Sequence, residues 1–276
     1  MDNSSGSFYS SPDKIFDTLC IYIMAENNSI NLLNKAFDVI ELLSQVGREM
    51  GVSEISRSLN MVKSGTFRIL NTLKERDLVY QNPSNKCYGL GLKFYFIGMA
   101  AQAGLPLCTV AKKHLDALSI TYEESFELSI PYAQYSQVPS CLVVSSGTSF
   151  TSLQRSMSLL RPLHATASGK CLLAFSSESE VKSYKGYELK KFTEKTVTSW
   201  DKLESELAEI RDQGFCYCCN EYNDHLSGIA VPVYDSMHSL LGALSVSGAN
   251  DHIEKLSQED LVRSLQRAAR SIGKNF

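Results

Sequence analysis

The fold of the N-terminal part can be inferred from one segment: Lys63-Ser-Gly-Thr-Phe-Arg-Ile-Leu-Asn-Thr-Leu-Lys-Glu-Arg76. One set of its residues recurs at i, i+3, i+4 and i+7, the spacing of the buried face of a helix: Thr66, Ile69, Leu70 and Leu73. A second set has the same spacing on the opposite side and is polar except for one aromatic ring: Ser64, Phe67, Arg68 and Asn71. We therefore expect a helix from Lys63 to Arg76 that packs on a core with one face and presents the other.

The sequence on either side of this helix completes an ordered series of elements. A first helix is expected from Leu32, with apolar residues spaced along one face: Leu33, Phe37, Ile40 and Leu43. A short second helix follows Ser53, and a tight break at Asn60-Met61 separates it from the helix at Lys63. Two apolar runs, 78–80 and 87–90, flank a polar turn and predict a β-hairpin. This order is typical of a winged helix-turn-helix.

The exposed face of the Lys63–Arg76 helix suits contact with double-stranded DNA. In a helix-turn-helix the second of the paired helices enters the major groove. There Arg68 is suited to guanine, Asn71 to adenine and Phe67 to a thymine methyl group. The predicted DNA-binding residues are Arg57, Lys63, Ser64, Thr66, Phe67, Arg68, Asn71 and Lys86. Gly65 costs about 1 kcal/mol inside a helix, so either it lets the backbone approach DNA closely or the helix begins later.

Length, composition and charge exclude several classes of protein. A chain of 276 residues with 43% hydrophobic and 21% charged residues is typical of a globular protein with two domains. No run approaches the roughly 18–20 apolar residues that span a membrane, and the polar start lacks a signal peptide. We expect a cytoplasmic protein without a membrane anchor and with its eight cysteines reduced. The net charge is −3, but residues 31–93 contain nine Lys or Arg and six Asp or Glu, which favours an anionic partner for that part.

The chain is expected to divide into four parts. A polar tail over residues 1–30 precedes a winged helix-turn-helix domain over 31–91 and a linker helix over 92–106. The remainder, 107–276, alternates strands and helices, with strands predicted over 127–131, 140–145, 215–218, 229–234 and 240–247. Its last helix opens with the cap sequence Ser257-Gln-Glu-Asp260. The last two strands form a hairpin, so this part is α+β with an antiparallel sheet.

With these elements in place, the sequence resembles the IclR family of bacterial transcription regulators. The segments that carry the resemblance are 33–40, 63–70 and 88–91, then Pro162-Leu-His-Ala-Thr-Ala-Ser-Gly-Lys170, 214–221, 229–233 and Ala243-Leu-Ser-Val-Ser-Gly248. The resemblance implies a GAF-like effector-binding domain, and a homodimer or homotetramer bound to palindromic operator DNA. It further implies a regulator, expected here to be a repressor, of a catabolic operon. The effector is expected to be a small metabolite such as an organic acid or a sugar derivative.

Carried over position by position, the resemblance implies six effector-binding residues: Ala167, Ser168, Cys218, Gly228, Ser245 and Ser247. The backbone N–H groups at the start of a helix over 168–175 suit a carboxylate. Ser245 and Ser247 are two apart on a strand and therefore face one side, towards the effector or, alternatively, towards water. The chain departs from the family at Cys218-Cys219, which replace a common acidic pair and so remove a carboxylate from the site.

Other chemistries find weaker support in the same segments. The alternative function is a thiol- or metal-sensing module that binds small molecules, with these candidate ligands: Cys216, Cys218, Cys219, Glu221 and His225. A closed zinc site needs a second cysteine pair, which the chain lacks. Ser168-Gly169-Lys170 lacks the first glycine of a phosphate loop, and His164 is expected to hydrogen-bond local backbone instead of serving a hydrolase. We therefore expect no enzymatic activity, no cofactor and no metal.

Overall fold

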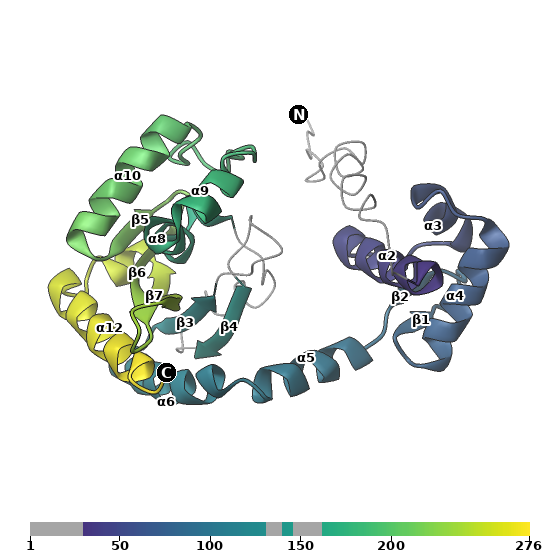
Figure 1. The fold of residues 1–276 in the computed structure, drawn as a ribbon, viewed down its shortest axis with the longest axis horizontal. Coiled ribbons are helices and arrows are strands. Elements are labelled where there is room, and N and C mark those ends of the chain that lie inside the picture. The colour runs from purple at the N-terminus through teal and green to yellow at the C-terminus, as the bar shows by residue number, and fades with distance from the viewer. Residues whose placement is uncertain (1–29, 131–139, 146–161) are drawn as a thin grey trace, which may run out of the picture. The chain divides into compact units, whose positions relative to one another are not determined.

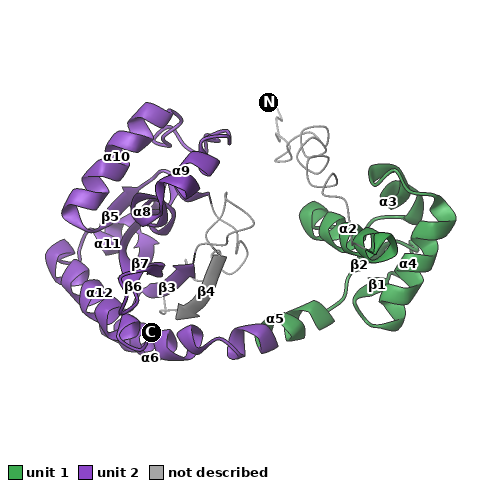
Figure 2. Cartoon of the chain, viewed as in Figure 1, with its two compact units in different colours: residues 1–99 green, residues 100–276 purple. Residues whose placement is uncertain are grey.

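The computed structural model describes residues 30–130, 140–145 and 162–276, with the backbone alone described for 140–145. The chain forms two compact units, residues 1–99 (unit 1) and 100–276 (unit 2), and the division falls within α5 (Lys93–Ala103) (Figure 2). In these described ranges no single helix is long and apolar enough to cross a membrane. α5 and α6 (Pro106–Tyr122) meet that criterion only as a pair, and they are bent by 87° at the break between them.

Unit 1 is a winged helix-turn-helix, as the sequence predicts. Its elements are α2 (Asn31–Val46), α3 (Val52–Ser58), α4 (Lys63–Glu75), β1 (Val79–Gln81) and β2 (Tyr88–Leu90) (Figure 1). The two strands pair antiparallel, and Met50 in the α2–α3 connection forms a bridge with Tyr88 on the other side of β2. The core between these elements consists of Val39, Leu43, Met50, Ile55, Ile69, Leu70, Leu73, Val79 and Tyr88.

Two details of unit 1 differ from the sequence-based expectation. The spacing in α2 predicts that Leu33 and Phe37 are buried, but they are 51% and 52% exposed, and Val39 is buried instead. α2 has apolar side chains on more than one face, so spacing alone does not identify the face that packs on the core. α4 begins at Lys63, so Gly65 lies inside it and a later start is wrong. A Cβ on Gly65 would have no atom within 4 Å, so packing within the chain does not require glycine there.

Unit 2 is built on a five-stranded antiparallel sheet with the strand order β4-β3-β7-β6-β5. The strands are β3 (Ser125–Ile130), β4 (Ser140–Ser145), β5 (Cys216–Cys219), β6 (Leu226–Tyr234) and β7 (Leu240–Ala249). β6 and β7 form the predicted hairpin. The sequence therefore predicts the α+β class and the antiparallel sheet correctly.

Helices cover this sheet on both sides (Figure 1). After α6 they are the 3₁₀ turn η1 (Leu163–Ala165), α8 (Ala167–Phe175), α9 (Glu178–Tyr184), α10 (Trp200–Gln213), α11 (Asn250–Ile253) and α12 (Gln258–Gly273). Ser257 accepts a hydrogen bond from the backbone N–H of Asp260, so the predicted cap of α12 is confirmed. α10 ends at Gly214, whose φ of 76° is a left-handed conformation that favours glycine.

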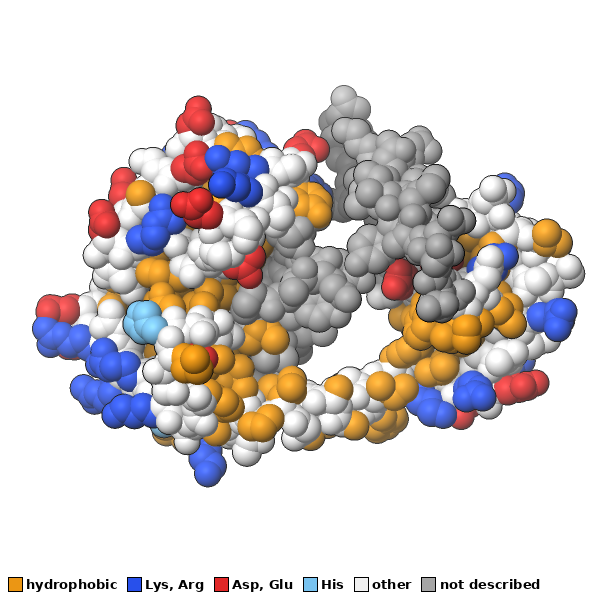
Figure 3. Space-filling model, viewed as in Figure 1, with side chains coloured by type: hydrophobic (Ala, Val, Ile, Leu, Met, Phe, Trp, Pro, Cys, Tyr) orange, Lys and Arg blue, Asp and Glu red, His pale blue; other side chains and the backbone are white. Residues whose placement is uncertain are grey.

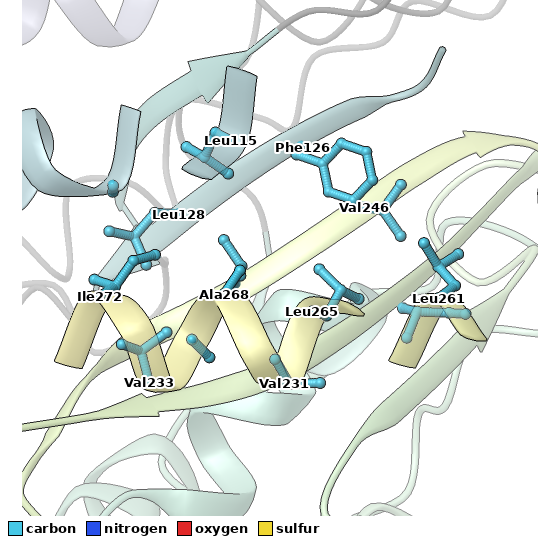
Figure 4. Packing of buried hydrophobic residues seen from close by; sticks show 14 of the residues in the cluster. Leu115, Phe126, Leu128, Val231, Val233, Val246, Leu261, Leu265, Ala268 and Ile272 are labelled. Carbon is cyan, nitrogen blue, oxygen red and sulfur yellow. The ribbon is translucent and has the colours of Figure 1, made fainter. Parts of the chain in front are cut away.

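The two faces of the sheet differ in character. The register places Leu128 beside Leu244, and these side chains pack with α6 and α12 in an apolar core (Figure 4). One residue along each strand, the register places Glu127 beside Ser245 on the opposite face. That face carries small and polar side chains, and its β5–β6–β7 part packs against α8. Alternate residues along each strand therefore form two different faces: one packs in the apolar core, and the other carries hydrogen-bonding groups.

Candidate DNA-binding and effector-binding sites

The outward face of α4 presents most of the residues that the sequence analysis assigns to DNA. The exposed or half-buried residues of this face are Lys63, Ser64, Phe67, Arg68 and Asn71. Phe67 is 46% exposed although its neighbour Leu70 is fully buried. Because the inner face of α4 is anchored in the core of unit 1, the outer face is held in one orientation. A rigid helix face of this kind is what recognition of base edges requires.

Thr66 does not belong to this face. Its side chain is 0% exposed, and its hydroxyl donates a hydrogen bond to the carbonyl of Val62 at 3.3 Å. Its spacing from Ile69 and Leu70 places it on the inner face of α4. A residue that reads DNA needs an exposed side chain, so the assignment of Thr66 to DNA binding is wrong.

Arg57 and Lys86 lie outside α4, and both are exposed. Arg57 Nε donates to the carbonyl of Ser53 at 3.2 Å, which holds the side chain along α3. Lys86 lies in the β1–β2 loop with φ 59°, and its backbone N–H donates to the carbonyl of Asn82 at 2.9 Å. Both cations are placed on the surface in a way that suits contacts with DNA phosphates.

The residues that the resemblance assigns to an effector lie on the polar face of the unit 2 sheet and in the first turn of α8. The register pairs Cys218 with Gly228, and Gly228 with Ser247, across β5, β6 and β7. A Cβ built on Gly228 would lie 3.2 Å from the Cβ of Ser247 and 3.4 Å from the Cβ of Ala167. The structure thus brings Ala167, Cys218, Gly228 and Ser247 together.

Ser168 and Ser245 complete this set and are only 3% and 2% exposed. The hydroxyl of Ser245 donates to Oε1 of Glu127 at 3.3 Å. Glu127 is itself 2% exposed and is a buried carboxylate that the sequence analysis does not single out. The serine face is therefore enclosed within unit 2, and the alternative of a face exposed to water is wrong.

The first turn of α8 is capped from within the chain. Thr166 Oγ1 accepts a hydrogen bond from the backbone N–H of Gly169 at 3.1 Å and donates to the carbonyl of Pro162 at 3.0 Å. The helix begins at Ala167, one residue before the expected start. Within the part of the chain that the structure describes, no acceptor contacts the backbone N–H groups of Ala167 and Ser168. These N–H groups suit an anionic group of a ligand.

Lys170 forms a buried ion cluster that sequence reasoning missed. Its side chain is 2% exposed, and Nζ donates to Glu221 Oε1 at 2.5 Å and to Glu206 Oε2 at 2.6 Å. Cys218 Sγ donates to the same Glu221 oxygen at 3.3 Å. Burial alone lowers the pKa of Lys170, but the carboxylates of Glu221 and Glu206, which accept its hydrogen bonds, outweigh burial and raise that pKa above its ordinary value. Lys170 is therefore a structural cation that ties α8 to α10 and to the end of β5.

Burial disfavours the thiolate form of the cysteines around this cluster. Burial is the main cause that raises the pKa of Cys216, of Cys218 and of Cys171 far above that of a free thiol. A protonated thiol is a poor nucleophile and a poor metal ligand. Over residues 30–130 and 162–276, no group of three or more His, Cys, Asp or Glu side chains is arranged to hold a metal ion. Nothing in these residues supports the thiol- or metal-sensing alternative.

His164 uses both ring nitrogens for structural hydrogen bonds. Nδ1 lies 2.8 Å from the hydroxyl of Tyr184, and Nε2 lies 2.9 Å from the carbonyl of Lys190. The backbone partner is therefore 26 residues away instead of local. Burial lowers the pKa of His164, which keeps the ring neutral. With both nitrogens engaged, this ring is not placed to act as a base for Ser168.

Comparison with known proteins identifies both units. A profile described as "IclR helix-turn-helix domain" matches residues 32–83, and one described as "Bacterial transcriptional regulator IclR C-terminal" matches residues 99–274. The chain belongs to the IclR family of bacterial transcriptional regulators. It is 31% identical over 248 residues to the HTH-type transcriptional regulator KdgR of Escherichia coli K12, covering 89% of this chain and 92% of that relative.

Two further relatives agree with this assignment. The HTH-type transcriptional repressor AllR of Escherichia coli K12 is 27% identical over 239 residues, covering 85% of this chain and 87% of that relative. An IclR homologue from Microbacterium hydrocarbonoxydans, solved in complex with 4-hydroxybenzoate, has the same fold, with a TM-score of 0.70, 21% identity and coverage of 88% and 98%. As a member of the IclR family, the chain is a ligand-responsive DNA-binding transcriptional regulator.

Proposed function

We propose that this IclR-family regulator is a repressor of catabolic genes that binds operator DNA with the outward face of α4 and with the β1–β2 loop. The observation that carries the proposal is the division of α4 into a buried apolar face and an exposed face with Arg68 and Asn71. Arg68 is suited to guanine and Asn71 to adenine. The name of AllR, a transcriptional repressor, supports the sign of regulation, and that of KdgR supports a transcriptional regulator.

The effector is proposed to be a small metabolite with an anionic group, such as an organic acid or a sugar acid. Among the residues that the structure describes, the backbone N–H groups of Ala167 and Ser168 meet no acceptor and favour an anion, and the side chains that surround them are small. The Microbacterium homologue was solved with 4-hydroxybenzoate, which is a small organic acid. Effector binding in unit 2 changes the affinity of unit 1 for DNA in this proposal.

The protein is proposed to act as a homodimer or homotetramer. α5 has no buried residue, and its exposed apolar side chains, visible in Figure 3, need a partner: Tyr95, Phe96, Ile97 and Met99. Leu33 and Phe37 on α2 are also exposed. A second copy of the chain is the proposed partner, because a palindromic operator is read by a two-fold symmetric protein. A cytoplasmic protein without catalytic activity fits this role.

Mobility shift of the purified protein on DNA from upstream of its own gene tests the proposal. The wild type and Arg68→Ala are compared at about 150 mM salt with excess non-specific competitor. We expect specific retention by the wild type that Arg68→Ala loses, and a steep loss of affinity as salt rises. Equal retention by both proteins would contradict the assignment of α4 as the reading helix.

A further inference from the structure

The β1–β2 loop of unit 1 is tied to the rest of the unit by one carboxylate. Glu49 lies in the connection between α2 and α3, and three side chains from the hairpin donate hydrogen bonds to it. Tyr80 Oη donates to Oε1 at 3.0 Å, Asn82 Nδ2 to Oε2 at 2.9 Å, and Asn85 Nδ2 to Oε2 at 2.8 Å. These partners are 31, 33 and 36 residues from Glu49 in sequence.

The two asparagines pass this constraint on to the loop backbone. Asn82 Oδ1 accepts from the backbone N–H of Ser84 at 2.9 Å, and Asn85 Oδ1 accepts from that of Cys87 at 2.8 Å. Each asparagine thus donates a hydrogen bond to Glu49 through its amide nitrogen and accepts one from the loop backbone through its amide oxygen. Lys86 lies between these contacts, with its backbone in a left-handed conformation. Gln81 Nε2 also donates to the carbonyl of Lys86 at 3.1 Å, so Glu49 and Gln81 together anchor the loop that displays Lys86.

The backbone of unit 1 places Glu49 where it meets the loop. The next residue, Met50, exchanges two backbone hydrogen bonds with Tyr88, of 2.9 and 2.8 Å, which holds Glu49 beside β2. Tyr80 reaches Glu49 by laying its ring over Gly89, its partner in the register. A Cβ on Gly89 would lie 2.7 to 2.8 Å from two ring carbons and the hydroxyl oxygen of Tyr80, so glycine is required there for Tyr80 to take this position.

The negative charge of a carboxylate on a DNA-binding unit lowers the affinity for DNA, because it repels the phosphates. Glu49 nevertheless stays ionised, since the hydrogen bonds from Asn85, Asn82 and Tyr80 lower its pKa. Fixing a loop before binding removes the entropy cost of ordering it on the partner. The net effect of Glu49 on DNA affinity is therefore the balance of a repulsion and a gain from pre-organisation.

We propose that Glu49 is a positioning residue for DNA binding, which holds the β1–β2 loop so that Lys86 meets a backbone phosphate. This inference rests on the proposed function of unit 1. The sign of the effect distinguishes it from simple electrostatics. Removal of the negative charge of Glu49 weakens DNA binding if the loop must be held, whereas it strengthens binding if the carboxylate only repels the phosphates.

The test compares variants of the full-length protein on DNA from upstream of its own gene and on a mixed-sequence duplex of about 30 base pairs. The variants are Glu49→Gln, Glu49→Ala, Lys86→Ala and the double variant Glu49→Ala/Lys86→Ala. Asp77→Asn is the control for charge, because Asp77 is an exposed acid outside α4 with no side-chain hydrogen bond or ion pair to the residues that the structure describes, and asparagine tolerates its left-handed backbone with φ 58°. Hydrogen exchange of the amides of Ser84 and Cys87 reports on the loop directly.

We expect Glu49→Ala and Lys86→Ala each to weaken binding by about three- to tenfold, and the double variant to be no weaker than either one, because both act through the same contact. Glu49→Gln weakens binding in the same direction, while Asp77→Asn leaves it equal or slightly tighter. Exchange at Ser84 and Cys87 becomes faster in both Glu49 variants. Unchanged or tighter binding by the Glu49 variants, or additive losses in the double variant, would overturn the proposal.

The exchange measurement separates this inference from the proposed function. If the wild type binds neither DNA, the proposed function fails and the role of Glu49 in it fails as well, even where exchange shows that Glu49 holds the loop. If the wild type binds DNA, and exchange in the Glu49 variants is unchanged, the positioning role alone is overturned.

Discussion

Substitution of Lys170 by methionine removes the cation from a buried ion cluster while keeping an unbranched side chain that is one atom shorter. Glu206 is 30% exposed in its side chain and turns to water when its partner is lost. Glu221 is 11% exposed and has no such outlet. In the described residues its Oε2 has no hydrogen-bond partner, and its Oε1 would keep only the weak S–H donor of Cys218. Lys170→Met therefore leaves one carboxylate buried and nearly unpaired.

The expected cost follows from that count of partners. Breaking a buried ion pair on one side costs about 3–5 kcal/mol. Since only Glu221 is stranded, we expect the lower end, about 3 kcal/mol of the free energy of unfolding of unit 2. With a urea dependence of about 2 kcal/mol per molar, the unfolding midpoint falls by about 1.5 M.

Urea unfolding followed by tryptophan fluorescence measures this loss in unit 2 alone. The chain has one tryptophan, Trp200, whose ring lies 5.5 Å from that of Tyr184 in unit 2. Lys202→Met is the matched control, because Lys202 lies 4.0 Å from the same Glu206 but is 64% exposed in its side chain. We expect it to cost under about 0.5 kcal/mol.

A second variant tests whether the stranded charge is the cause. Lys170→Met/Glu221→Gln removes the carboxylate together with its partner, and we expect it to recover about half of the loss. A loss below about 1 kcal/mol for Lys170→Met, or no recovery in the double variant, would show that the unpaired Glu221 carboxylate is not the cause.

Three further predictions follow from the same structure. Burial lowers the pKa of His164, so the unfolded chain binds a proton at this residue before the folded chain does as pH falls below about 6.5. Unit 2 therefore loses stability as pH falls, and the urea midpoint drops between pH 7.5 and 5.5. His164→Gln makes this drop smaller, and an unchanged drop would contradict the prediction. Iodoacetamide labels the half-buried Cys219 before the buried Cys218, as peptide mass spectrometry detects, and prompt labelling of Cys218 would restore the thiol-sensing alternative. Phe96→Glu puts a charge on the exposed apolar surface of α5 and lowers the mass found by light scattering to that of one chain; an unchanged mass above that of one chain would show that this surface is not the subunit interface.

Features set by neighbouring residues are predictable from this sequence. The spacing of Ile69, Leu70 and Leu73 predicts α4 and its inner face, because apolar residues that recur every three or four positions lie on one side of a helix. The cap at Ser257 is equally local. Local patterns fail in α2, where apolar residues occur on more than one face and Phe37 remains exposed.

Contacts between distant residues are not predictable in this way. Lys170 and Glu221 are 51 residues apart, and Glu49 and Asn85 are 36 apart. In each pair one partner lies in a loop or at a strand end, where the sequence has no repeating pattern that could predict the contact. The resemblance to the IclR family assigns Ala167, Gly228 and Ser247 to one site, and the sheet register that joins them comes from the fold alone.

Selection of genomic DNA fragments by the purified protein shows whether α4 reads a specific operator. The wild type and the double variant Arg68→Ala/Asn71→Ala are each mixed with sheared genomic DNA, and the retained fragments are sequenced. We predict that the wild type enriches one inverted-repeat sequence upstream of a small number of genes, and that the variant loses this enrichment. No enriched sequence with the wild type, or the same sequence enriched equally by the variant, would contradict the account of α4 as the helix that reads the operator.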